Sequence, residues 1–134
     1  MNKHFVHGVL AAVVSSAMGV TYLFIYERMS LISFSQVINI GTITGASVAG
    51  CTLMAIAYFG LEKSNIRSLK GWINLVIIAL SFFSIFVPLL HNLPLDIDSP
   101  ELFPCLAVPM HFFPAISFLA LDSLFVNQPT LPIQ

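Results

Sequence analysis

Four long apolar stretches, separated by short polar segments, dominate the pattern of hydrophobic and polar positions along this chain. Each stretch holds about 19 to 25 residues, enough for a helix rising about 1.5 Å per residue to cross a hydrocarbon core roughly 30 Å thick. The sequence therefore predicts an all-α polytopic membrane protein, a bundle of four transmembrane helices forming one transmembrane domain over residues 1–134. The predicted spans are residues 5–26, 37–61, 72–90 and 102–126.

Composition supports this prediction and excludes two other classes of protein. The chain is 57% hydrophobic and 8% charged, with a mean hydropathy of +0.93, whereas soluble domains carry about 25% charged residues. Five Lys and Arg against six Asp and Glu give a net charge of −1. Without a basic run to neutralise phosphates, nucleic-acid binding is excluded as well.

The distribution of basic residues predicts the orientation in the membrane. Lys3 and the segment between the second and third spans, with Lys63, Arg67 and Lys70, share one side, and Arg28 lies on the other. The positive-inside rule places the richer side, with both termini, in the cytoplasm. The small size favours a bacterial plasma (inner) membrane. The basic segment is interpreted as a topology determinant; the alternative, a site for anionic lipid, normally needs about four to eight cations.

Small residues at four-residue spacing mark the predicted helix-packing surfaces. Because lipid tails are as apolar as leucine, helices associate in a bilayer where small side chains let their backbones approach closely. The sequence predicts that the first two spans pack on each other; the alternative is that one of the stripes pairs with a second copy in a homo-oligomer. The packing residues are Gly8, Ala12 and Ser16 in the first span and Gly41, Gly45 and Gly50 in the second.

Polar residues of the third span are predicted to face the bundle. Asn74, Ser81 and Pro88 recur every seven residues and so share one helix face. Hydrogen bonds between helices are the expected role of Asn74 and of the serines in this span.

Three prolines interrupt the last span, at positions 104, 109 and 114. A proline inside a helix removes a backbone hydrogen bond and kinks the helix. The sequence leaves open whether this span begins at Leu102 or at Pro109, where a proline in the first turn would be favourable. The choice decides how deep His111 lies in the membrane.

His111 has two interpretations. If it lies near the outer end of the span it comes level with His91, and two facing imidazoles could hold a haem or a metal ion. The simpler interpretation is a hydrogen bond from His111 to a backbone carbonyl freed by a proline. No metal site and no cofactor is predicted from these residues, although His91 and His111 remain the candidates.

Asp122 is the most informative ionisable residue in a span, because a carboxylate inside a membrane normally faces protein or water. His7 lies at the same depth in the first span. A His7–Asp122 pair is predicted as a structural tie between the first and last spans. The alternative is a proton relay in which these two residues exchange a proton.

No phosphate-binding loop, catalytic triad or paired catalytic carboxylates occur in the sequence, so no catalytic residue and no enzyme is predicted. The four spans, the small-residue second helix, the basic middle segment and the Met110–His111 pair resemble small uncharacterised four-helix integral membrane proteins of bacteria. This resemblance implies a topology and no chemistry.

The leading functional hypothesis is a non-enzymatic helix bundle in the lipid bilayer that acts by self-association or as a subunit of a larger membrane complex. The second hypothesis is transport of protons, ions or small solutes through His7, Asp122 and His111. The third is a haem- or metal-binding redox protein built on His91 and His111.

Overall fold

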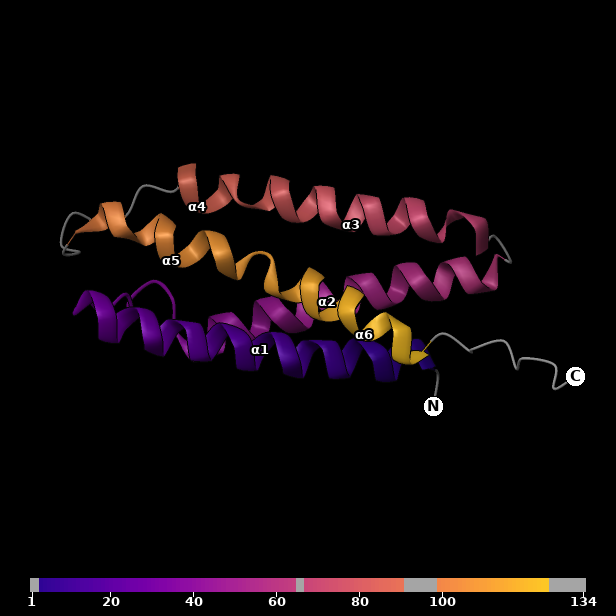
Figure 1. The fold of residues 1–134 in the computed structure, drawn as a ribbon, viewed down its shortest axis with the longest axis horizontal. Coiled ribbons are helices and arrows are strands. Elements are labelled where there is room, and N and C mark those ends of the chain that lie inside the picture. Colours follow the sequence, from indigo (N-terminus) through magenta and orange to yellow (C-terminus); the bar gives the residue numbers. More distant parts are fainter. Residues whose placement is uncertain (1–2, 65–66, 91–98, 126–134) are drawn as a thin grey trace, which may run out of the picture.

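Four helical segments run side by side along the long axis of the protein (Figure 1), in a computed structural model that describes residues 3–64, 67–90 and 99–125. All four are long and apolar enough to cross a membrane, as a multi-pass membrane protein requires. The first two are α1 (Lys3–Ser30) and α2 (Ile40–Lys63). The third consists of η1 (Arg67–Leu69), α3 (Lys70–Ser84) and α4 (Phe86–Leu90), and the fourth of η2 (Pro100–Leu102), α5 (Phe103–Met110) and α6 (Phe113–Phe125).

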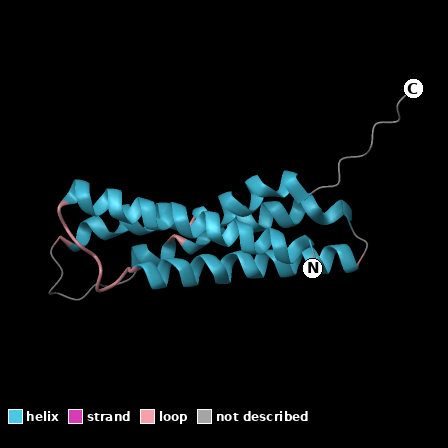
Figure 2. Ribbon diagram, turned by 90° about the horizontal axis from the view of Figure 1, so that it is seen from below, coloured by secondary structure: helices cyan, strands magenta, loops and turns pink. Residues whose placement is uncertain are grey.

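The start of α1, the end of α2, the start of α3 and the end of α6 lie together at one end of the bundle (Figures 1 and 2). With four spans in alternating direction, this placement follows from the topology. The basic residues at positions 3, 63 and 70 therefore belong to the same end.

The connection after α1 sets where α2 begins. Leu31 takes a left-handed conformation (φ 60°) and ends the first helix, and Glu27 Oε1 then accepts from Ser33 Oγ at 2.9 Å and from the Phe34 amide at 3.1 Å. Asn39 forms a capping box with Thr42, which satisfies amides that a helix start would otherwise leave unpaired. These contacts start α2 at Ile40, three residues after the predicted boundary.

The last span is helical from its beginning but breaks in the middle. Pro114 has no N–H and its ring would clash with the carbonyl of the preceding turn, so the chain tightens into three-residue turns in which His111 N bonds Val108 O and Phe112 N bonds Pro109 O. Of the two predicted starts, Leu102 is therefore the closer, and the interruption falls at residues 111–112.

The first two helices pack along a face of small residues. Ala11 and Ser15 of α1 are fully buried, and the Ser15 hydroxyl donates to Ser47 Oγ of α2 at 3.0 Å. A Cβ at Gly8 would lie 2.8 Å from Ala55 Cβ and one at Gly19 2.6 Å from Ile43 Cγ2. The stripes of the first span therefore serve packing within the chain, and α1 also lies along α6.

Replacing Gly8 with valine is expected to lower the free energy of unfolding by about 1.5 kcal/mol, because a side chain at this position overlaps Ala55 and the helices must separate. Gly60→Val is the matched control, since nothing lies within 4 Å of a Cβ there. Steric trapping in bicelles would measure both. Equal stability of the two variants would contradict the close α1–α2 contact.

By contrast, α3 is loosely held. Ile77 is its one buried residue, and most of its bulky side chains are exposed. With so few of its side chains buried, α3 packs loosely against the rest of the bundle.

Candidate functional site

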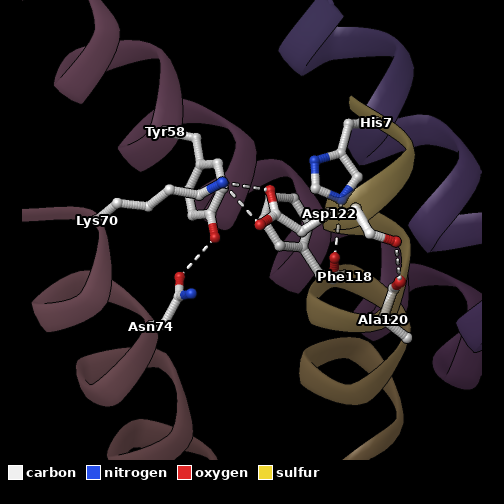
Figure 3. Close-up of polar contacts among 8 residues, drawn as sticks. His7, Tyr58, Lys70, Asn74, Phe118, Ala120 and Asp122 are labelled. Atoms are coloured by element: carbon white, nitrogen blue, oxygen red, sulfur yellow. Dashed lines mark hydrogen bonds and ion pairs between the residues drawn. The ribbon is translucent and has the colours of Figure 1, made fainter. Parts of the chain in front are cut away.

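Side-chain contacts at the end of the bundle where α1 begins link all four helical segments in a closed circuit, of which Figure 3 shows the contacts of α6 with α1 and α3 and of α3 with α2. We call this group the polar clasp. One contact joins α1 to α6, one joins α6 to α3, one joins α3 to α2, and a last set joins α2 back to α1. The clasp comprises Lys3, His4, His7, Tyr58, Glu62, Lys70, Asn74, Asp122 and the carbonyl of Phe118.

Asp122 forms its ion pair with Lys70. The ammonium of Lys70 lies 2.9 Å from Oδ1 and 2.7 Å from Oδ2 of the carboxylate. The side chains are 34% and 19% exposed, respectively, and Lys70 Nζ also lies 5.3 Å from the centre of the Tyr58 ring. Asp122 is near the end of α6 and Lys70 is the first residue of α3, so the pair closes the bundle across two helix ends.

His7 is fully buried and bonds to the backbone of α6 rather than to Asp122. Its Nε2 donates to the Phe118 carbonyl at 2.8 Å, and the imidazole stacks on Phe118 and Phe125 with ring centres 4.0 and 4.7 Å apart. Because a carbonyl only accepts, Nε2 carries the proton. Nδ1 is buried and has no hydrogen-bond partner within the described ranges, so the ring is neutral.

The prediction that His7 pairs directly with Asp122 is therefore wrong: His7 bonds the Phe118 carbonyl, and Asp122 pairs with Lys70. The helices that it was expected to join, α1 and α6, do meet at His7. Asp122 takes Lys70 instead because an ammonium group compensates a carboxylate fully, whereas a neutral imidazole does not. The carbonyl of Phe118, one turn before Asp122, accepts the hydrogen bond from His7 Nε2.

Asn74 accepts a short hydrogen bond from the Tyr58 hydroxyl, which links α3 to α2. This confirms the expectation that Asn74 bonds between helices, whereas the same expectation for Ser84 is wrong, because its hydroxyl donates to the Ser81 carbonyl of its own helix. Tyr58 also packs edge-on against His7 and Phe118, so its buried ring connects the α2–α3 contact to the α1–α6 contact.

Glu62 completes the circuit at the more exposed edge of the clasp. Its two carboxylate oxygens bind Lys3 and His4, at the start of α1. Neither Glu62 nor Tyr58, nor a role for Lys70 in an ion pair, was predicted from the sequence. Their common position within about one turn of the same bundle end is the signal that would have found them.

The arrangement of the clasp favours holding helices over moving protons. His111 and Asp122, the histidine and the carboxylate of the last span, are eleven positions apart, or roughly 16 Å along a helix. Ser117, between them, lies with its hydroxyl 3.7 Å from Met18 Sδ. Among the residues that the structure describes, no chain of hydrogen bonds joins His111 to the clasp.

His111 lies at the break between α5 and α6. Its amide bonds the Val108 carbonyl, which leaves the Ala107 carbonyl without its usual helical partner, and His111 Nδ1 donates to that oxygen at 2.7 Å. This confirms the predicted hydrogen bond to a backbone carbonyl, although the carbonyl is freed by the tightened turn at the break and not directly by the missing N–H of a proline. His91, its proposed partner for haem or metal, lies outside the described residues, and no group of three metal-ligating side chains occurs within them.

The structure divides the predicted packing residues between two surfaces. Gly8 and Ala12 are buried against α2, with Ser16 half-buried beside them, and Gly50 faces Pro114 of α6. Gly41 and Gly45 are exposed, and nothing lies within 4 Å of a Cβ placed at Gly45. The expectation that these two glycines contact the first span is wrong, because the face of α2 toward α1 and α6 passes through Ser47, Cys51, Ala55 and Tyr58.

Comparison with protein-family models, with curated proteins and with solved structures gives no match for this chain.

Proposed function

We propose that this protein is a non-enzymatic membrane helix bundle that acts by association, with the uncovered face of α2 as its contact surface for a second copy. Association with another chain, as a subunit of a larger membrane complex, would use the same face. The observation that carries the proposal is that Gly41 and Gly45 form a GxxxG pair that no other part of the described chain covers.

Five exposed positions of α2, at spacings of three and four, lie in one continuous stripe, which we call the α2 outer face. The glycines near the start of α2 would let a second helix approach closely, and the larger side chains further along α2 would interdigitate with that helix. The face consists of Gly41, Gly45, Val48, Thr52 and Ile56.

A groove beside this face supports a protein partner. It lies between α1 and α2, has a volume of about 490 Å³, and includes Val48 and Thr52 in its wall. Ser16 also lines it, and the Ser16 hydroxyl oxygen is buried without a hydrogen-bond partner among the described residues.

The polar clasp fits this role because it fixes the four helices relative to one another. An association surface needs a rigid scaffold, since ordering loose helices on binding would reduce affinity. The two glycine surfaces then have separate roles, with Gly8 inside the chain and Gly45 toward the partner.

We further propose that the clasp end faces the cytoplasm of a bacterial cell, in its plasma membrane. Support comes from the charge distribution: Lys3, Lys63 and Lys70 belong to this end, and Arg28 is near the opposite end of α1. The positive-inside rule assigns the more basic side to the cytoplasm.

Replacing Gly45 with leucine tests the proposed surface. The side chain has open space in the single chain, so folding is expected to be unchanged while dimerisation in lipid bilayers weakens by about tenfold or more, because the two backbones can no longer approach. Energy transfer between donor- and acceptor-labelled copies, measured over a range of protein-to-lipid ratios, would report the dissociation constant.

The matched control is Gly71→Leu on α3, where a Cβ also meets open space. This variant is expected to dimerise as the unmodified protein does. If Gly45→Leu retained full dimerisation, or if both variants weakened it equally, the α2 outer face would not be the contact surface.

A further inference from the structure

A second cavity, separate from the groove beside the α2 outer face, lies between α2, α3 and the break that separates α5 from α6. Its volume is about 530 Å³, within the range of pockets that hold small molecules. It exists because α3 is loosely packed and because Ala46 and Gly50 leave space on a third face of α2. Its walls are mostly apolar.

Among the residues that the structure describes, His111 is the one ionisable side chain in the lining of this cavity. It lies ten residues beyond Glu101 on the last span, or about 15 Å along the helix, which is near the middle of a hydrocarbon core about 30 Å thick. Ionisable residues at such depth are costly and usually serve a function.

The hydrogen bond to the Ala107 carbonyl defines what His111 offers. Because that oxygen only accepts, the imidazole proton is on Nδ1, and Nε2 carries a lone pair. No residue of the described chain donates to Nε2. Nε2 of His111 is therefore a hydrogen-bond acceptor within the membrane, next to an apolar cavity. A ligand that carries a hydrogen-bond donor would satisfy it.

Two of the hydroxyls in the lining already donate to backbone carbonyls. Ser84 donates to the Ser81 carbonyl at 2.8 Å and Thr42 to the Asn39 carbonyl at 2.8 Å, so neither hydroxyl proton is available to His111. The described part of the lining contains no Asp, Glu, Lys or Arg, and a charged ligand would therefore be buried there without compensation.

We propose that this cavity binds a neutral hydroxyl-bearing amphiphile from the lipid phase, an alcohol or phenol whose O–H donates to His111 Nε2 while its apolar part fills the space between α2 and α3. This role goes beyond association through the α2 outer face, because it uses a different face of α2 and a different part of the last span.

The test uses a matched pair of probes, 4-hexylphenol and its methyl ether 4-hexylanisole, titrated into the full-length protein in lipid nanodiscs. The protein carries ¹⁵N-labelled histidine, and its His111 signal is assigned with the His111→Phe variant. The phenol is expected to move the Nε2 resonance saturably, because a donated hydrogen bond changes the shielding of a lone-pair nitrogen. The anisole, which has no donor, is expected to leave it in place.

Two variants distinguish the contribution of the hydrogen bond to binding from that of the cavity volume. Because His111→Phe lacks the reporting nitrogen, its affinity is compared with that of the unmodified protein by isothermal titration calorimetry in nanodiscs, and it is expected to bind the phenol about fivefold to tenfold more weakly, the effect of losing one hydrogen bond. Ala46→Phe fills the cavity from α2 and is expected to abolish the saturable shift while His111 remains. Its control is Ala49→Phe, an exposed position of α2 outside the lining, for which binding should be unchanged.

Several outcomes would overturn the proposal. A shift that grows linearly without saturation would mean that the phenol only partitions into the bilayer, and a cavity filled by lipid chains would give no shift. An equal response to the anisole would exclude the hydrogen bond. Unchanged binding in Ala46→Phe would exclude the cavity.

Discussion

Replacing His7 with alanine is expected to lower the free energy of unfolding by about 3 kcal/mol, the largest single effect among the changes considered. The imidazole is fully buried and stacked on Phe118 and Phe125, so its removal leaves a cavity lined by two aromatic rings. It also removes the hydrogen bond that ties α1 to the Phe118 carbonyl of α6. Steric trapping in bicelles would measure the loss.

His7→Phe is the matched control for this experiment. A phenylalanine ring keeps the stack and fills the space but cannot donate to the carbonyl, so the expected loss is about 1 kcal/mol. The same variant removes a group that any proton relay through His7 needs. A proton flux in liposomes that His7→Phe abolished without loss of stability would favour transport over a structural role.

Replacing Lys70 with methionine is expected to lower the free energy of unfolding by about 2 kcal/mol, because it leaves the carboxylate of Asp122 unpaired at the membrane edge. The loss stays below the cost of a fully buried charge because both side chains keep partial contact with solvent. Lys63→Met is the control, since Lys63 is exposed at the end of α2 and has no recorded ion pair among the described residues. Its expected effect is within about 0.5 kcal/mol.

The double variant Lys70→Met with Asp122→Leu identifies the cause of that loss. Replacing both charges with apolar groups removes the unpaired carboxylate, and most of the lost stability should return. A double variant no more stable than Lys70→Met alone would show that Lys70 acts through its packing against the Tyr58 ring instead.

Hydrophobic patterning predicted the four helices because long apolar runs with charged ends have few other solutions. Two further predictions, that Asn74 bonds between helices and that His111 bonds a backbone carbonyl, follow from local rules: an amide in a membrane needs a partner, and a break near prolines leaves carbonyls without their helical donors. The start of α2 was missed by three residues because a capping box at Asn39, rather than hydropathy, sets it.

The sequence could not show which side chains pair with each other between helices. Depth along each span brought His7 and Asp122 to the same level, but the rotation of each helix decides which side chains meet, and a level pair need not face each other. Lys70 was assigned to the topology signal alone, although it is also the counter-ion of Asp122. The two glycine motifs looked alike in sequence, and only the rotation of α2 showed that Gly45 points away from the first helix while Gly8 meets Ala55.

Association through the α2 outer face is tested most directly by counting copies of the unmodified protein in a bilayer. Single-molecule photobleaching of fluorophore-labelled protein, reconstituted at decreasing protein-to-lipid ratios, would give that number without detergent. The proposal predicts two-step bleaching at higher densities, with a reversible transition to single steps on dilution. Single-step bleaching at every density, in the absence of any other chain, would contradict self-association.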